Sequence, residues 1–576
     1  MTAPVEPLRP LGEILDQRQK MLLVGSLMLT LFLGALDQTI VSTAVPRILA
    51  DLGGFGLLSW LFTSYMLAST VVMPVVGKLS DIFGRKLLLI GGVVVFLVGS
   101  ALCGTAQSMV ALIIFRAVQG VGGGAIFSLV FATNADLFPP AQRGKYIGFF
   151  TGVFSLASLL GPTIGGLLTD HAGWRWVFYV NIPVGCLAIP AIWFNLPLRG
   201  GQGHPKIDFA GAALLASSTI LLLLALVWAG DQYSWGSVQV LGSMAAAVVL
   251  LGVFIAQERR HPEPIIPLSL FQNRSFVQSG LVVFTFGVAV FGALAYLPTF
   301  VQTAVGASAT ISGVIGTPQA IGSLVTSIIG GQIISRRGRY RMQTILGSIC
   351  LFGSLVWLST LSVDTPRWEI SARMVVLGLG FGVVLPTMSL VAQNSVGHAM
   401  IGIASSTNQF LRQIGMVLGT AVFGAVLANA YHAGFDDQLS AEAKSTLEQA
   451  EATGALPAGT LGEFDDPTLA LAPGTYQEVR AAISALPGGP ALFAETQSAQ
   501  REAVAIAVRR IFLVASVVAA LTVVLAFTMK EVPMRRGFGQ PVPAGAGAGP
   551  PGAAPPGTAA PAAETASAPG PTSGAG

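Results

Sequence analysis

Fourteen apolar stretches run along this chain and constrain its fold more than any other feature. A helix needs roughly 20 apolar residues to cross the hydrocarbon core of a bilayer. The stretches cover residues 22–46, 57–77, 87–106, 109–131, 146–168, 176–196, 207–228, 237–256, 276–300, 311–334, 343–361, 370–392, 402–428 and 505–529. Of the 576 residues, 53% are hydrophobic and 10% are charged. Because a soluble domain carries about 25% charged residues, the sequence predicts an all-α polytopic membrane protein with 14 transmembrane helices and excludes a secreted soluble enzyme.

Lysine and arginine residues are unevenly shared between the two sides of the membrane. With the N-terminus placed in the cytoplasm, the segments on that side hold twenty of them, and the short loops opposite hold only Arg47, Arg175 and Arg367. Loops on the cytoplasmic side of membrane proteins carry the excess of Lys and Arg. We therefore expect a multi-pass protein of the cell membrane with both termini in the cytoplasm. The net charge of +4 comes from these loops and does not indicate a nucleic-acid partner.

A short internal repeat divides the spans into two groups of six. Gly77, Gly84 and Arg85, in the loop after the second span, recur 254 residues later in the loop after the tenth. Two six-span halves related by a parallel repeat are typical of one transporter architecture. The sequence then predicts a cytoplasmic tail at 1–21, a six-helix bundle at 22–196, an inserted helix pair at 207–256, a second six-helix bundle at 276–529 and a disordered tail rich in Pro, Ala and Gly at 530–576.

The link between the last two spans is unusually long. Residues 429–504 hold eleven acidic and three basic residues, and the topology places them outside the cell. Such a segment is a lid, a docking module for an extracytoplasmic partner or a tolerated insertion, and the sequence leaves these three open.

Five motifs resemble those of the major facilitator superfamily, and within it the fourteen-span drug:proton antiporters. Residues 77–86 match the superfamily's loop between spans two and three, and 36–46 resemble the first-span motif, with Ser42 where Asn is usual and Val45 where Leu is usual. Residues 116–122 resemble the span-four motif and 174–183 the turn into span six. Span five resembles the antiporter motif, with Ala157 in place of a Gly. The resemblance covers about residues 20–530.

Asp37 is the one acidic residue deep inside a predicted span. It lies roughly 14 Å from the outer end of span one, and Arg116 lies roughly 10 Å from the outer end of span four, at 1.5 Å per residue. The two share a layer and are predicted to pair across the cavity. A carboxylate whose hydration and distance to an arginine change between two states also changes its affinity for a proton. The resemblance implies that Asp37 is the proton-coupling residue, and the alternative is a static tie between helices.

Asp81 lies at the cytoplasmic surface rather than deep in the membrane. The resemblance implies that it meets the start of span thirteen and holds an inner gate closed, since a carboxylate is favourable at a helix N-terminus. Gly77 and Gly84 would allow close approach and tight turns, and Arg85 would orient Asp81. The alternative is a simple basic turn.

Span five carries Gly161, Pro162, Gly165 and Gly166. Proline kinks a helix and glycine permits close helix approach, which predicts a packing hinge; the resemblance adds the export direction. Five polar residues are candidates for the lining of the cavity, and each could hydrogen-bond either a neighbouring helix or a ligand. These residues are Gln38, Gln119, Gln319, Asn408 and Gln409. Arg412 either faces the inner half of the cavity or extends to the inner surface.

The chain carries no phosphate-binding loop, no HExxH or GxSxG motif and no Cys/His cluster, so we expect neither an enzyme, nor a cofactor, nor a metal site. The resemblance implies a proton-coupled antiporter that exports amphipathic drugs or related small molecules by alternating access, with the substrate, protons and the lipid bilayer as its partners. Export of a lipid or of a dedicated metabolite or antibiotic is the alternative, and a non-transporting sensor or scaffold is a remote one.

Overall fold

The computed structural model describes residues 10–53, 57–198, 207–229, 232–457, 460–464, 467, 469, 473–532, 534 and 537. Across these residues the chain forms helices and no β-strand, and fourteen helical segments are long and apolar enough to cross a membrane. The predicted all-α fold with 14 spans is confirmed. Of the two predicted tails, residues 1–9 of the first and most of 530–576 lie outside the described residues, and α2 begins at Gln17, within the predicted first tail. The domain boundaries stay predictions.

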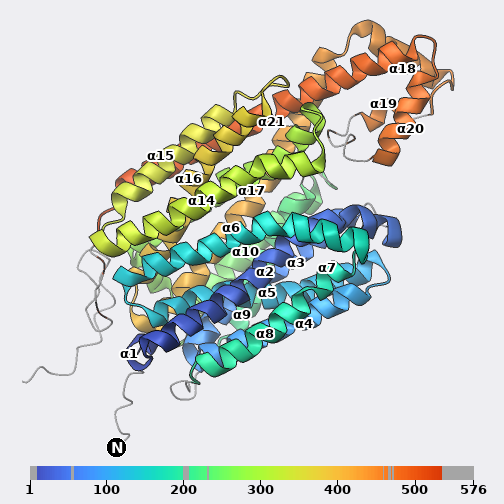
Figure 1. Ribbon diagram of the computed structural model, residues 1–576. Coiled ribbons are helices and arrows are strands. Elements are labelled where there is room, and N and C mark those ends of the chain that lie inside the picture. The colour runs from blue at the N-terminus through green and yellow to red at the C-terminus, as the bar shows by residue number, and fades with distance from the viewer. Residues whose placement is uncertain are drawn as a thin grey trace, which may run out of the picture.

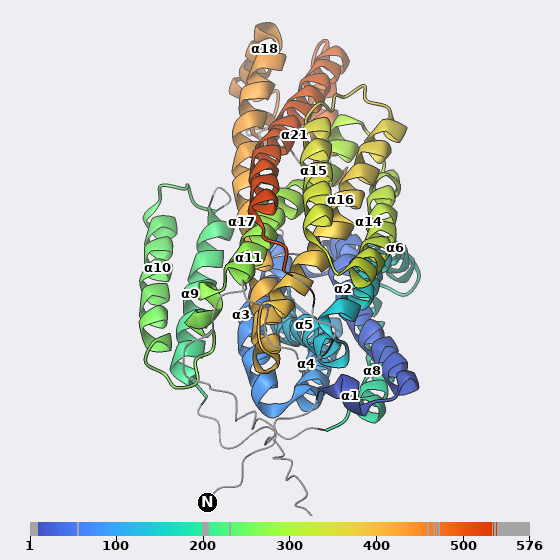
Figure 2. The same ribbon diagram turned by 90° about the vertical axis from the view of Figure 1, so that its left-hand side faces the viewer.

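The first six spans form one group of helices, which we call the first bundle. Its helices are α2 (Gln17–Leu52), α3 (Leu58–Phe83), α4 (Arg85–Thr105), α5 (Met109–Leu137), α6 (Pro140–His171), α7 (Trp176–Tyr179) and α8 (Asn181–Asn195), with the short α1 (Leu11–Ile14) before them. Two further spans follow, α9 (Phe209–Trp228) and α10 (Val238–Glu258). Figure 2 shows this pair at the side of the molecule, where α9 contacts both α3 and α17.

The last six spans form the second bundle. Span nine is irregular, running from α11 (Arg274–Phe286) through the π-helical η3 (Gly287–Phe291), α12 (Gly292–Leu294) and α13 (Leu297–Thr299) to the π-helical η4 (Phe300–Ala304), after the short η2 (Leu268–Gln272). The other spans are α14 (Ala309–Arg337), α15 (Arg341–Leu358), α16 (Arg367–Asn394), α17 (Ile401–Gln438) and α21 (Gly489–Thr528), with the short η5 (His398–Met400) before α17. Single π-helical turns accommodate an extra residue and are frequent at functional sites.

Local sequence explains where several helices begin and end. The carboxylate of Asp16 accepts the backbone N–H of Gln19 while the Gln19 side chain accepts the N–H of Asp16, a reciprocal cap that starts α2. Gly84 adopts φ +87° between α3 and α4, and Gly338 ends α14 in the left-handed region at φ +66°. Glycine takes these conformations at no steric cost, so the repeated glycine of the two basic loops is needed to reverse the chain.

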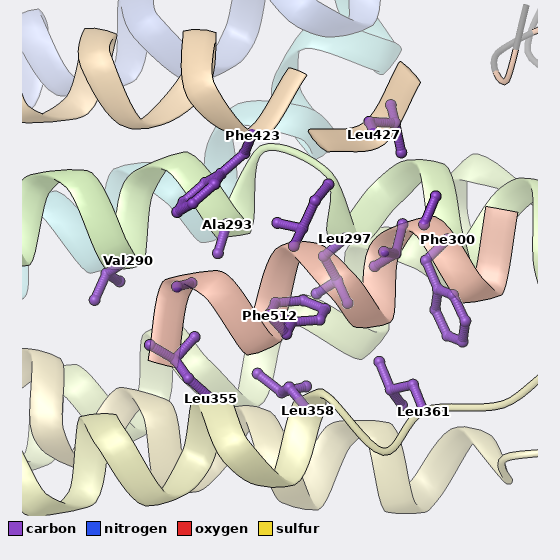
Figure 3. Close-up of a cluster of buried hydrophobic side chains, with 14 of the residues drawn as sticks. Val290, Ala293, Leu297, Phe300, Leu355, Leu358, Leu361, Phe423, Leu427 and Phe512 are labelled. Carbon is purple, nitrogen blue, oxygen red and sulfur yellow. The ribbon is translucent and has the colours of Figure 1, made fainter. Parts of the chain in front are cut away.

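A cluster of buried apolar side chains holds the second bundle together. Figure 3 shows residues of span nine, α15 and α17 gathered around Phe512 of α21, among them Phe300, Leu358 and Phe423. All four are fully buried. Because lipid is as apolar as these side chains, close packing rather than escape from water holds such helices together.

The acidic segment 429–504 is built on two long helices. The last helix, α21, runs without a break from Gly489 into the last span, and α17 continues to Gln438. The two long helices carry α18 (Ala441–Ala452), α19 (Thr460–Glu463) and α20 (Pro473–Ser484) at one end of the molecule (Figure 1). The Tyr431 hydroxyl donates to the Phe464 carbonyl at 2.6 Å, and the rings of Phe435 and Phe464 stack. The segment is therefore packed onto the helices that bear it.

The two bundles meet closely at one end of the molecule. We call it the basic end because Lys78, Arg85 and Arg336 lie there, at the ends of α3, α4 and α14. Along α6 and α14, Ser335 donates to the Ala141 carbonyl at 2.7 Å and Ser327 donates to the Gly148 carbonyl at 3.0 Å. A Cβ added to Gly148 would lie 2.3 Å from the backbone carbonyl oxygen of Ser327. The hydrogen bonds between these helices run from the basic end to Ser155, which bonds Ser323 at 2.7 Å. The structure is thus closed at the basic end.

We predict that Gly148→Ala separates α6 from α14. The added methyl group overlaps a backbone oxygen that cannot move independently, and such overpacking costs typically 1–3 kcal/mol. Spin labels at Lys145→Cys and Arg336→Cys, in a chain whose three native cysteines are replaced, should report a longer distance by electron paramagnetic resonance. Gly166→Ala on the same helix meets nothing within 4 Å and should leave the distance unchanged. An unaltered distance in both variants would contradict the close contact.

Candidate functional site

Asp37 lies at the centre of a buried polar network inside the first bundle. Arg116 Nη1 donates to Asp37 Oδ2 at 2.7 Å, Gln119 Nε2 donates to Oδ1 at 2.7 Å, and Asn181 Nδ2 donates to Oδ1 at 2.9 Å. The four side chains come from α2, α5 and α8, and each is at most 1% exposed. Both carboxylate oxygens act only as acceptors, which is the pattern of an ionised carboxylate.

Further contacts fix the arginine of this network. The Arg116 guanidinium lies 4.4 Å from the centre of the Tyr65 ring, and its Nη1 also donates to Gln119 Oε1 at 2.7 Å. The Ser100 hydroxyl accepts from both Gln119 and Asn181. An ion pair buried in this way is stable only while both partners are present and hydrogen-bonded, because either charge alone is poorly solvated.

The position of the pair differs from the prediction. Asp37 and Arg116 were expected to face each other across the cavity, but neither lines the cavity between the bundles. The apolar face of α5 lies toward that cavity, and the charged pair is turned into the first bundle. The sequence analysis included Asn181 only within the motif at 174–183 and did not predict its bond to Asp37. Its place in that motif, after the turn into span six, is the signal that marked it.

Asp81 makes the contact that the resemblance implied. Its oxygens accept the backbone N–H groups of Gly402 and Ile403 at 3.0 and 2.9 Å, at the start of α17. Arg85 pairs with Asp81 at 2.5 Å and with Asp136, at the end of α5, at 2.9 Å. A carboxylate placed against the first N–H groups of a helix satisfies them and is favoured by the helix dipole. The contact therefore ties the first bundle to the second at the basic end.

Glycine makes this contact sterically feasible. A Cβ on Gly77 would lie 2.1 Å from the Ser406 hydroxyl oxygen, and a Cβ on Gly402 would lie 2.4 Å from an Asp81 oxygen. Asp136 and His398, whose ring nitrogen is 3.7 Å from Asp136, complete the cluster. Sequence reasoning missed both, since neither belongs to the repeated loop motif.

The glycines of span five pack α6 against α2 rather than against the other bundle. A Cβ on Gly161 would lie 2.0 Å from Thr39 Oγ1, and one on Gly165 would lie 2.6 Å from the Ile40 carbonyl. Pro162 is exposed, and Gly166 faces open space. Two of the four motif residues, Gly161 and Gly165, therefore make the close approach. They contact α2 within one helical turn of Asp37.

A cavity lies between the bundles. It is lined by Leu31, Phe127, Phe131, Ile147, Phe150, Thr151 and Phe154 of the first bundle and by Phe291, Phe381, Leu385, Pro386, Ser389, Asn408, Gln409 and Arg412 of the second. The space open to the centres of water-sized molecules is about 50 Å³. Of the six predicted polar cavity residues, Asn408, Gln409 and Arg412 line it. Gln119 belongs to the Asp37 network, and Gln38 and Gln319 are half-buried elsewhere on α2 and α14.

Among the described residues, no group of three or more His, Cys, Asp or Glu side chains is placed to hold a metal ion. The arrangement offers instead a buried ion pair, a closed contact between bundles and an aromatic cavity.

The Asp37 network predicts a specific pattern of stabilities. Asp37→Asn and Arg116→Gln each leave one buried charge without its partner and should each lower the free energy of unfolding by about 3–5 kcal/mol. The double variant buries no charge and should lose less than the sum of the two. Thermal unfolding in detergent measures all three. Arg175→Gln, which breaks an exposed pair with Asp51, should cost no more than about 1 kcal/mol, and strict additivity of the two buried substitutions would refute the pairing.

The Asp81 contact predicts an effect on the basic end alone. Asp81→Asn keeps the shape of the side chain but removes its charge, which is worth up to about 2 kcal/mol at a helix N-terminus. The closed arrangement should then lose stability, and a cysteine at Ser406, now fully buried, should react several-fold faster with a maleimide. The matched control is Asp51→Asn, which removes an acid at the opposite end; equal labelling rates in all three proteins would show that Asp81 holds nothing closed.

Comparison with known proteins agrees with the fold. The family model of the Major Facilitator Superfamily matches residues 27–420. Multidrug transporter protein MdtP of Bacillus subtilis (strain 168) is 41% identical over 411 residues, which make up 71% of this chain and 76% of that protein. Multidrug resistance protein 3 of the same strain is 40% identical over 417 residues, or 72% of this chain and 81% of that protein. The solved structure of the human organic anion transporter MFSD10 (TETRAN) is similar at a TM-score of 0.56 and 17% identity, over 71% of this chain and 93% of that one. The chain therefore belongs to the Major Facilitator Superfamily, as its motifs indicated, a family of membrane transporters and not of enzymes.

Proposed function

We propose that this protein is a proton-coupled antiporter that exports amphipathic small molecules by alternating access. The observation that carries the proposal is the fully buried Asp37 of the first bundle, which accepts a hydrogen bond from Arg116 at 2.7 Å. Two relatives with about 40% identity are named for multidrug transport and multidrug resistance, which supports drugs as the cargo. The cell membrane and cytoplasmic termini remain part of the same proposal.

The network around Asp37 supports a proton-dependent step. Asp37 accepts three hydrogen bonds in this conformation, and protonation weakens them because a neutral carboxyl is a poorer acceptor than a carboxylate. Protonation also removes the charge that matches Arg116. A state in which Asp37 carries a proton is then a state with altered contacts among α2, α5 and α8. This linkage between proton binding and helix contacts is what coupling requires.

The contacts between bundles support a rocking motion. They are concentrated at the basic end, through Asp81 with α17 and through the paired backbones of α6 and α14. Breaking these contacts would open the cavity to the basic side, which the charge distribution assigns to the cytoplasm. In the proposed cycle, a state that is closed at the basic end with Asp37 ionised would precede proton uptake from the opposite side.

The proposal predicts that export follows a proton gradient and depends on Asp37. The purified protein in proteoliposomes should move at least one of three fluorescent amphipaths: ethidium (a cation), N-phenyl-1-naphthylamine (neutral) or 8-anilinonaphthalene-1-sulfonate (an anion). An imposed pH gradient should drive the flux against the probe's own gradient, and Asp37→Asn should abolish that uphill flux while it retains downhill exchange.

Asp51→Asn is the matched control, since it removes an exposed acid from the same helix and should preserve uphill flux. Gradient-driven flux that survives in Asp37→Asn would reduce the Asp37–Arg116 pair to a tie between helices. No flux of any probe would reject general drug export and favour a lipid or a dedicated metabolite as the cargo.

A further inference from the structure

Arg412 of α17 is the one charged side chain among the residues that line the cavity. The other lining residues are apolar or aromatic except for Thr151, Ser389, Asn408 and Gln409. No described carboxylate lies within ion-pair distance of Arg412, in contrast to Arg85, Arg116 and Arg373, each of which has an acidic partner. The cavity therefore carries a net positive charge.

The contacts of Arg412 leave this charge uncompensated. Its Nε donates to Gln409 Oε1 at 2.9 Å, its Nη1 lies 3.4 Å from the Met416 sulfur, and its guanidinium lies 5.6 Å from the centre of the Phe291 ring. All three neighbours are neutral. A guanidinium offers five N–H donors, so these contacts leave donor capacity that is open to the cavity.

A second donor is unsatisfied on the same wall. Asn408 lines the cavity, is 2% exposed, and its Nδ2 has no hydrogen-bond partner in the described structure. A buried amide donor without an acceptor is unfavourable, and such a group in a native structure calls for a partner supplied from elsewhere. Arg412 and Asn408 are four residues apart on α17 and so lie on the same side of the helix, one turn from each other.

The rest of the wall fits an aromatic body. Six phenylalanines from four segments surround the space, and Phe291 is placed there by the π-helical turn of span nine. Aromatic rings pack well against flat apolar groups. The wall thus provides a large apolar surface with two donors and one positive charge on a single helix.

We propose that the cavity selects amphipathic organic anions, with an aromatic body against the phenylalanines and one carboxylate or sulfonate group bound by Arg412 and Asn408. This inference rests on the proposed transport function and names its substrate class. The anion supplies the negative charge that no described side chain places beside Arg412. A lipophilic cation would instead bring a second positive charge into a poorly hydrated space.

The test compares two probes with the same ring system. 8-Anilinonaphthalene-1-sulfonate is N-phenyl-1-naphthylamine with an added sulfonate, so the pair isolates the charge. Wild-type proteoliposomes should export the sulfonate in preference to the neutral probe and to ethidium. Arg412→Gln should slow export of the sulfonate about tenfold or more, the effect of losing one charge-assisted hydrogen bond, and should change export of the neutral probe less than twofold.

Two further variants separate charge from packing. Arg412→Lys keeps the charge and should retain most of the preference for the sulfonate. Asn408→Asp is nearly isosteric and places a carboxylate one turn from Arg412, so it should reduce export of the sulfonate as Arg412→Gln does. Preference for the neutral probe or ethidium in the wild type, or an equal loss of both naphthalene probes in Arg412→Gln, would overturn the inference while drug export stands.

A different result would separate the inference from the proposed function. If no probe moves in any gradient, the proposed transport of drugs fails, and calorimetric binding of the sulfonate to the protein in nanodiscs decides the inference on its own. Binding that Arg412→Gln weakens about tenfold would support an anion site, and binding that does not depend on Arg412 would overturn it.

Discussion

A charged side chain inside a membrane-spanning bundle has almost no water to solvate it, so its stability depends on the groups that the fold places around it. The first bundle follows this constraint closely. Arg116, Gln119 and Asn181 all donate to Asp37, and Tyr65 covers the guanidinium. The positions of α2, α5 and α8 relative to one another are fixed by these bonds. Any motion of one of these helices relative to the others must therefore preserve the network or break some of its hydrogen bonds.

The same constraint explains why glycine appears wherever the bundles meet. Lipid gives no hydrophobic drive for helices to associate, so contact must come from close packing and from polar groups that reach across. Gly77 lets Asp81 reach the N-terminus of α17, and Gly148 lets α6 approach the backbone of α14. These contacts are strong only at short range. A small rotation would therefore remove them together.

The sequence predicted the broad architecture well because its signals are periodic and local. Apolar length gave the spans, and the resemblance of the Gly77–Arg85 loop to the superfamily's motif implied the contact of Asp81 with the start of α17. The number of residues from each helix end also indicated that Asp37 and Arg116 lie in one layer of the membrane. The sequence did not predict that the Asp37–Arg116 pair is turned into the first bundle, away from the cavity. Which side of a helix faces the cavity depends on neighbours that are distant in sequence. Asp136 reaches Arg85 from another helix, and no local pattern marks such a meeting. The π-helical turns of span nine, which bring Phe291 to the cavity, also have no sequence signature.

One helix carries both the contact that closes the basic end and the charge that faces the cavity. Gly402 and Ile403 bind Asp81, and Arg412 lies ten residues further along α17, a rise of about 15 Å. The helix is unbroken between these points, so it moves as a unit. A motion of α17 that releases Asp81 also shifts Arg412 relative to Phe127 and Phe150 of the first bundle. Conversely, whatever neutralises Arg412 changes the free energy of each position of α17, because a bound group shifts an equilibrium only through its different interaction with the two states. The Asp81 contact and the cavity are thus linked by a single helix, and no chain of intermediate contacts is needed to connect them.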